Sequence, residues 1–409
     1  MRCNKGSLLR SIRSNIKYYV TGNVGILLLT WFLYAIGNAV TSPYFSIYLK
    51  MLGANAVDIG LTYSVSVVAQ LMTIIPGGYL TDTMGRRLSI IIGTWLITIT
   101  TYLMVIAPSW QLLAVFYALS MAAGFYQPAL LAILIDSLPP EKYASGILVT
   151  SVLPQIPWLV LPPIGGLLIN KYGLLGIRFA YLFSAAISTI VSIIRHFTIK
   201  ETLNNKSRSI SLRELLRSYY SLGNMTHLPS DLLIMYLTTL IMYIAVMPIN
   251  TLLPIYVVYR LGLSTVYWGY LVSASYAAYI LLGILLLFYV DKYRGKLLIT
   301  GIIINTVGSA IGLLENTYST IGYMLLLQVG AQLIMTAIQS ELGNRINIDR
   351  RGYGMSLLIT FQLIGQTIGS YVAGELYRLN TESLFLIPLV LSLGLMVINL
   401  GRAHRTVNE

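Results

Sequence analysis

The chain has 409 residues, of which 56% are hydrophobic and only 10% are charged, whereas about a quarter of the residues of an ordinary soluble domain are charged. One globular core could not bury this much apolar surface, so the composition excludes a soluble fold. The formal net charge is +13, which a membrane protein can owe to its basic loops and their attraction to anionic lipid, so nucleic acid is not an expected partner.

Metal and cofactor chemistry find little support in the composition. The only cysteine, Cys3, excludes a disulfide within the chain and removes thiolate metal sites. The three histidines, His196, His227 and His404, are far apart in the sequence. We therefore expect neither a metal site nor a cofactor.

The apolar residues fall into blocks of roughly 20 residues, the length that a helix needs to cross about 30 Å of hydrocarbon. Only helices and closed barrels satisfy every backbone group inside lipid, and the short alternating segments of a barrel are absent. We predict an all-α membrane protein with twelve spans. They are residues 24–50, 57–80, 88–107, 111–136, 145–169, 176–195, 231–258, 266–290, 297–314, 319–344, 353–377 and 382–400.

One connection is much longer than the others. Residues 200–230 are basic and rich in serine and asparagine, which is typical of a linker along the lipid surface. We predict that it joins two six-helix bundles, residues 1–199 and 231–409.

The lysine and arginine residues predict the orientation, because such residues near the ends of spans stay on the cytoplasmic side. With the N-terminus inside, only five of the 27 basic residues fall in outer loops. These five are Lys50, Lys171, Arg178, Arg260 and Arg378. The sequence therefore predicts a multi-pass protein of the cell membrane with both termini in the cytoplasm.

The two predicted bundles match each other at an offset of 209 residues. Gly60 aligns with Gly269 and Asp82 with Asp291. An even number of spans in each half makes the repeats parallel, an arrangement typical of secondary transporters whose substrate site lies between the halves.

A charged loop follows the second span. Residues 77–87 read GGYLTDTMGRR and resemble the signature loop of the major facilitator superfamily, with a degenerate copy after the eighth span. The motif residues are Gly78, Asp82, Gly85, Arg86 and Arg87, and in the copy Asp291, Lys292 and Arg294. The span count, the long central loop and the repeat extend this resemblance to the whole chain. It implies the major facilitator fold of two pseudo-symmetric six-helix bundles and a transporter rather than an enzyme.

The resemblance also implies roles for the loop. Asp82 would dock on the N-terminus of the eleventh helix when the inner face is closed, because unpaired N–H groups and partial positive charge favour a carboxylate there. The arginines would hold the loop, or alternatively serve only as cytoplasmic anchors.

The fifth span carries a motif that is similar to the antiporter motif of the drug-efflux branch. It consists of Pro157, Pro162, Gly165 and Gly166, although proline and glycine are also common in other membrane helices. Phe116 stands where that branch often has an arginine in its fourth helix, so this position does not support proton-driven efflux.

In the implied fold, eight helices line a central cavity, and their polar and aromatic residues at mid-depth are candidate solute contacts. These are Asn38, Gln70, Gln127, Gln155, Tyr243, Asn250, Tyr276, Gln332, Gln362 and Gln366. The alternative for each is a hydrogen bond between helices, which contributes only about 1 kcal/mol.

We find no lysine or arginine at mid-depth in the sequence, so we expect a neutral or amphipathic solute and poor transport of di- or tricarboxylates and sugar phosphates. Candidate proton carriers are Asp136, Glu341 and Glu375, with uncoupled facilitated diffusion as the alternative.

The predicted function is a monomeric transporter, secondary active or facilitative, that moves a small solute through the bilayer by alternating access. Efflux is the first direction considered, and uptake of a sugar or another nutrient is the alternative. A sensor that keeps this fold without transport is a second alternative.

Overall fold

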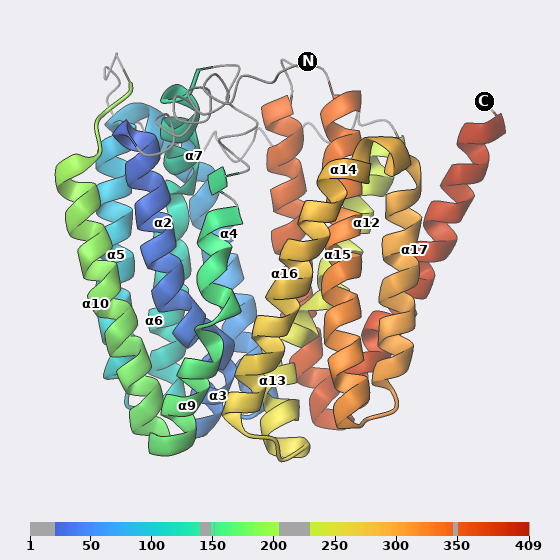
Figure 1. Ribbon diagram of the computed structural model, residues 1–409, viewed down its shortest axis with the longest axis horizontal. Coiled ribbons are helices and arrows are strands. Elements are labelled where there is room, and N and C mark those ends of the chain that lie inside the picture. Colours follow the sequence, from blue (N-terminus) through green and yellow to red (C-terminus); the bar gives the residue numbers. More distant parts are fainter. Residues whose placement is uncertain (1–20, 140–148, 151, 204–229, 347–350, 409) are drawn as a thin grey trace, which may run out of the picture.

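The computed structural model describes residues 21–139, 149–150, 152–203, 230–346 and 351–408, without the side chains of Asp82 and of residues 287–295, among others. All regular secondary structure in these ranges is helical (Figure 1). Eleven of the described helices are long and apolar enough to cross a membrane, and residues 296–312 form a shorter apolar helix at the place of the predicted ninth span. The prediction of an all-α membrane fold is confirmed.

The helices before the linker cover the first six predicted spans. They are α2 (Gly22–Thr41), η1 (Ser42–Tyr44), α3 (Phe45–Met51), α4 (Ala56–Met84), α5 (Arg86–Val105), α6 (Trp110–Ala122), η2 (Ala123–Tyr126), α7 (Gln127–Asp136), η4 (Leu153–Leu159), α9 (Pro162–Tyr172) and α10 (Leu174–Thr198). We call this set the N-terminal helices.

The helices after the linker cover the other predicted spans. They are α12 (Ser230–Thr251), α13 (Leu253–Ile255), the π-helical turn η6 (Tyr256–Arg260), α14 (Thr265–Gly312), α15 (Thr317–Arg345), α16 (Arg351–Leu379) and α17 (Ser383–Asn408). We call this set the C-terminal helices.

Four spans are not the uniform helices that hydropathy predicts. Each is interrupted near a proline: Pro43 lies in η1, Pro128 at the start of α7, Pro157 inside η4 and Pro254 in α13. Proline has no backbone N–H and its ring clashes with the preceding turn, so the chain changes to a tighter or wider helical form there.

The predicted eighth and ninth spans, in contrast, form the single helix α14 of 48 residues. A straight helix of this length would extend about 72 Å, more than twice the thickness of the hydrocarbon layer. It folds back on α15: Gly283 faces the Gln332 side chain, and Gly301 lies against the backbone of Gly330. The chain therefore turns back within α14, because Gly283 and Gly301 are 18 residues apart but face residues of α15 that are only two apart.

Hydrogen bonds between distant residues fix which helix ends lie together. At one end, the Asn23 side chain donates to the carbonyl of Lys200 at 3.0 Å, and the N–H of Arg86 donates to Glu201 at 3.2 Å. We call this the polar end, and Figure 1 shows the last turns of α17 at the same end. At the opposite end, Tyr48 donates to the carbonyl of Met104 at 2.7 Å.

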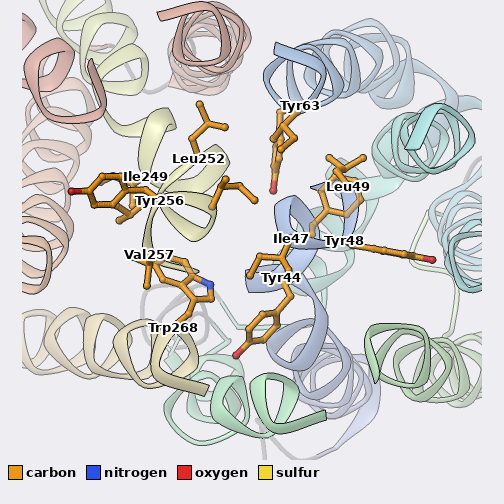
Figure 2. Packing of buried hydrophobic residues seen from close by; sticks show 14 of the residues in the cluster. Tyr44, Ile47, Tyr48, Leu49, Tyr63, Ile249, Leu252, Tyr256, Val257 and Trp268 are labelled. Atoms are coloured by element: carbon orange, nitrogen blue, oxygen red, sulfur yellow. The ribbon is translucent and has the colours of Figure 1, made fainter. Parts of the chain in front are cut away.

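The largest hydrophobic cluster lies at this opposite end, which we call the sealed end. It combines residues of both sets of helices, including Tyr44, Ile47 and Tyr63 with Leu252 and Trp268, and all of them are buried. Figure 2 shows these side chains between the ribbons of the two sets. The core therefore joins the N-terminal and C-terminal helices at one end of the bundle.

Candidate functional site

A cavity of about 470 Å³ opens among the N-terminal helices. Its lining includes the side chains of Trp31, Tyr34, Asn38, Gln70, Tyr117, Tyr126, Gln127, Trp158 and Arg195. This volume falls in the range of small-molecule sites, and apolar walls with a few polar groups are their usual composition. We call it the larger cavity.

A second cavity of about 240 Å³ lies between the two sets of helices, next to the hydrophobic cluster. Asn250 and Tyr276 contribute to its lining, as does Gln328. Trp158 lines both cavities and stacks on Tyr276, with ring centroids 4.6 Å apart and planes 20° apart. This aromatic pair joins η4 to α14 where the two cavities meet.

The structure thus brings together only part of the predicted set. Asn38, Gln70 and Gln127 lie in the larger cavity, and Asn250 and Tyr276 in the smaller one. Five other candidates line neither of these cavities: Gln155, Tyr243, Gln332, Gln362 and Gln366.

Two of these five have neighbours that explain their position. Gln332 faces Gly283, with its Nε2 3.3 Å from the place of a glycine Cβ. The Cβ of Tyr243 lies 2.9 Å from the corresponding place on Gly365. Both side chains fill the space that a glycine leaves on a neighbouring helix.

Arg195 was not among the predicted cavity residues. It lies near the end of the sixth predicted span and was counted with the basic residues on the cytoplasmic side. The structure shows it 3% exposed and in the lining of the larger cavity. An arginine from the last turn of α10 therefore reaches this cavity, although no lysine or arginine lies at mid-depth of a predicted span. Packing decides which way a long side chain near a helix end points, and the hydropathy of the sequence does not predict this direction.

Gly165, Gly166 and Pro162 of the fifth-span motif lie at the sealed end, and we call the close contacts between helices there the seal. A Cβ on Gly166 would stand 2.4 Å from the carbonyl oxygen of Thr265, and one on Gly165 would stand 2.3 Å from that of Val40. Thr265 donates a hydrogen bond of 2.7 Å to the carbonyl of Gly166, and Pro162 accepts one of 2.5 Å from Tyr44. Glycine is required here because the backbones of α9, α2 and α14 touch.

Two further contacts extend this seal across the sets. Trp268 on α14 donates from Nε1 to the carbonyl of Pro43 at 2.8 Å. On the other side, a Cβ on Gly60 of α4 would stand 2.5 Å from the Ser370 carbonyl and 3.0 Å from the Cα of Gly374 on α16. The seal therefore consists of close backbone contacts on two sides, with aromatic side chains between them.

The loop after α4 forms the polar end. Gly85 alone separates α4 from α5 and has a φ of 99°, a conformation that glycine adopts most readily. Arg86 forms an ion pair with Asp136 and donates to the hydroxyl of Thr202 at 3.0 Å. Arg87 donates to the carbonyl of His196 at 2.9 Å.

Glu201 completes this network. Its two carboxylate oxygens accept from the backbone N–H groups of Arg86 and Arg87 at 3.2 and 3.3 Å, as expected of a carboxylate at the N-terminus of a helix. Both arginines therefore contact the segment at and just after the end of α10.

The remaining motif residues, apart from Gly85, lie within α4 and α14. Asp82 lies in α4, and Asp291, Lys292 and Arg294 lie in α14, but the side chains of these four residues are outside the described part of the chain. Gly78 is in α4 with open space where a Cβ would stand.

Each candidate proton carrier has an arginine partner. Asp136 pairs with Arg86, Glu341 with Arg345 at 2.6 Å and Glu375 with Arg378 at 2.9 Å. Protonation of any of these carboxylates would leave an arginine without this counter-charge.

Comparisons with known proteins agree with this architecture. A sequence profile described as the Major Facilitator Superfamily matches residues 27–271 and 235–407. The chain is 22% identical over 379 residues to the quinolone resistance protein NorA of Staphylococcus aureus (strain MRSA252), covering 91% of this chain and 95% of NorA. It is 24% identical over 363 residues to an uncharacterized MFS-type transporter of Methanocaldococcus jannaschii, covering 87% and 91% of the two chains.

Solved transporters share the fold. A crystal structure of a mutant of the nucleoside transporter NupG aligns with a TM-score of 0.72 at 12% identity, over 92% of this chain and 99% of that one. A mutant of the peptide transporter POT aligns with a TM-score of 0.73 at 13% identity, over 91% and 93%. The chain belongs to the Major Facilitator Superfamily and is a multi-pass membrane protein of this secondary transporter family, not an enzyme.

Proposed function

We propose that this secondary transporter moves a small neutral or amphipathic solute by alternating access, and that the larger cavity receives the solute. The observation that carries this proposal is a cavity of about 470 Å³ with amide, hydroxyl and aromatic side chains. Such a lining matches a solute with an apolar body and a few polar groups.

The seal supports an assignment of the conformation. The backbone contacts and hydrogen bonds described above join the two sets of helices at the sealed end, opposite Gly85 and Lys200. Together with the excess of basic residues in the inner segments, this makes the sealed end the outer face. We therefore infer an inward-open state, two bundles of residues 1–199 and 231–409 joined by the linker 200–230, and both termini in the cytoplasm.

Export is the direction that we favour. NorA is named for quinolone resistance, and removal of a toxic compound from the cell is one physical route to resistance. Uptake of a sugar or another nutrient is the alternative, because the amides of the larger cavity could also bind hydroxyl groups.

Flux into proteoliposomes tests these functions. The purified protein is reconstituted and supplied with neutral amphipathic dyes and, separately, with labelled sugars. Saturable movement of a dye that falls when Gln70 or Gln127 is replaced by Leu supports the proposal. Saturable sugar movement with no dye movement supports the nutrient permease. Binding without any flux would indicate a sensor.

The gate at the polar end is the next part of the proposal. Asp82 docks on the N-terminal end of α16 when the inner face closes, so Asp82→Asn should favour the inward-open form and reduce flux while leaving membrane insertion intact. Labelling of an engineered cysteine from the cytoplasmic face measures this population. Unchanged labelling together with normal flux contradicts the gate.

Coupling to protons through Asp136, Glu341 or Glu375 makes a separate prediction. Flux is measured with and without an imposed pH gradient in the unaltered protein and in Asp136→Asn, Glu341→Gln and Glu375→Gln. If one carboxylate carries the proton, only its variant loses the response to the gradient. Equal responses in all three exclude this assignment, and a wild-type flux that ignores the gradient favours facilitated diffusion.

A further inference from the structure

Arg195 is a cation that the N-terminal helices enclose. Its Nε donates to the hydroxyl of Thr30 at 3.2 Å, and its Nη1 donates to the hydroxyls of Thr94 at 3.1 Å and Tyr126 at 3.4 Å. The guanidinium also lies 6.0 Å from the centroid of the Tyr126 ring. Four elements, α10, α2, α5 and η2, therefore fix the position of this one side chain.

These hydroxyl groups accept hydrogen bonds from the guanidinium of Arg195 but do not neutralise its positive charge. Hydroxyl groups are neutral, and no carboxylate of the described residues forms a salt bridge with Arg195. The side chain is only 3% exposed, where an unbalanced charge costs free energy. The site is therefore arranged for a positive charge and lacks its negative partner.

One edge of the guanidinium remains available. Nη2 takes part in none of the three hydrogen bonds, and it is not among the fully buried polar atoms that lack a partner. Arg195 lines the larger cavity, and we infer that Nη2 faces it. The two N–H groups of Nη2 can donate to an oxygen of a ligand in this cavity.

We propose that Arg195 binds the anionic group of an amphipathic solute, so that the larger cavity selects molecules with one carboxylate or sulfonate and an apolar or aromatic body. This inference rests on the proposed function and specifies its solute. A charge-assisted hydrogen bond from Nη2 would supply the missing counter-charge.

The rest of the lining limits the solute further. Trp31, Tyr34 and Trp158 offer flat apolar surfaces in the same cavity, while Asn38 and Gln70 offer amides. Among the described residues that line this cavity, Arg195 is the only lysine or arginine. A second negative group would therefore meet no second cation, which agrees with the expectation that dicarboxylates and sugar phosphates are poor substrates.

Equilibrium binding to the purified full-length protein tests the site without any transport step. The probes are naphthalene carboxylate and its neutral analogue naphthalene carboxamide, which have nearly the same shape. Their binding is followed by the fluorescence of the tryptophans, two of which line the cavity. The unaltered protein should bind the carboxylate more tightly, by on the order of tenfold.

Variants separate binding from support of the fold. Arg195→Gln should abolish the preference for the carboxylate, and Arg195→Lys should retain part of it. The control Arg178→Gln removes an arginine that holds the carbonyl of Ala107 at the sealed end, and it should leave the preference unchanged. A merely structural role of Arg195 would weaken both probes equally and leave their ratio intact.

The outcomes also distinguish this site from the proposed function. No preference for the carboxylate in the unaltered protein, or the same preference in Arg195→Gln, overturns the anion site even if neutral dyes are transported. A preference that depends on Arg195, together with an absence of flux for every solute, supports the site and contradicts the transporter proposal.

Discussion

The two ends of the bundle are built from different chemistry. At the sealed end, glycines bring backbones of the N-terminal and C-terminal helices into contact, and uncharged side chains fill the remaining space. At the polar end, charged contacts join Arg86, Arg87 and Asp136, which belong to the N-terminal helices, with Glu201, which lies just after the end of α10.

This difference separates two tasks. In the proposed alternating access, contacts between the sets form and break in each cycle, and close packing without charge can do so without desolvating ions. Contacts within one set can persist throughout, so strong ion pairs suit them. We therefore expect changes at the sealed end to alter the conformational equilibrium and changes in the Arg86 network to alter stability.

The largest effect is expected for Gly166→Ala. The new Cβ would stand 2.4 Å from the Thr265 carbonyl oxygen and 2.8 Å from the Tyr44 hydroxyl, and such overpacking typically costs about 1–3 kcal/mol. Because this cost falls only on the sealed form, the ratio of sealed to open protein should drop about 5- to 150-fold, and flux should fall with it.

Labelling from the sealed end, which is the proposed outer face, measures that shift. Asn250→Cys in a Cys3→Ser background places a single thiol in the smaller cavity, and Gly166→Ala should speed its reaction with an impermeant maleimide. Gly394→Ala is the matched control, since a Cβ there meets no atom within 4 Å. Equal labelling rates in the two alanine variants would contradict the role of the glycine seal.

A smaller effect, of a different kind, is expected for the Arg86 and Asp136 pair. Their side chains are 15% and 34% exposed, so we expect a coupling of about 1–2 kcal/mol in a double-mutant cycle with Arg86→Gln and Asp136→Asn. Thermal unfolding in detergent provides the measurement, and labelling of the Asn250→Cys thiol should not change.

The pair of Glu341 and Arg345 is the control for this cycle. These residues are one turn apart on α15 and partly exposed, so their coupling should be only about 0.3–0.5 kcal/mol. A strong change in outer-face labelling on loss of the Arg86 pair would show that the polar network does take part in switching.

The smallest effect is expected for the stack of Trp158 on Tyr276. An aromatic pair contributes about 0.5–1.5 kcal/mol beyond its buried area, and this one joins the two sets beside the seal. Trp158→Leu and Tyr276→Leu should each raise outer-face labelling slightly, and the double variant should raise it by less than the sum. Additive effects would mean that the rings do not act as a pair.

Hydropathy predicted the membrane spans because apolar length is a local property of the sequence. The prolines at the interruptions, Pro43 and Pro254, are present in the sequence. A proline in a membrane helix can cause either a kink or a change of helical form, and the packing of neighbouring helices decides which of the two occurs. The eighth and ninth predicted spans correspond to the two apolar parts of α14, Thr265–Leu286 and Lys296–Gly312, although α14 continues through the basic segment between them.

The site was predicted less completely than the fold. Gln332 and Asn38 both lie at mid-depth, yet one fills the space beside Gly283 and the other lines a cavity. Helical spacing predicts which residues share one face of a helix. The packing of the helices decides whether that face turns toward a cavity or toward a neighbouring helix. Arg195 was missed for a related reason, since its distance from a helix end does not reveal that its side chain turns inward.

The uncharged seal has an electrical consequence. A water-filled cavity that opens to one side carries the potential of that side to its floor, so the voltage across the membrane falls mainly over the thin barrier that remains. Moving one elementary charge through 100 mV changes its energy by about 2.3 kcal/mol, but the hydrophobic cluster at the sealed end contains no charged residue. At this end the membrane voltage therefore acts on charged residues outside the cluster, such as Arg178, which donates to the carbonyl of Ala107.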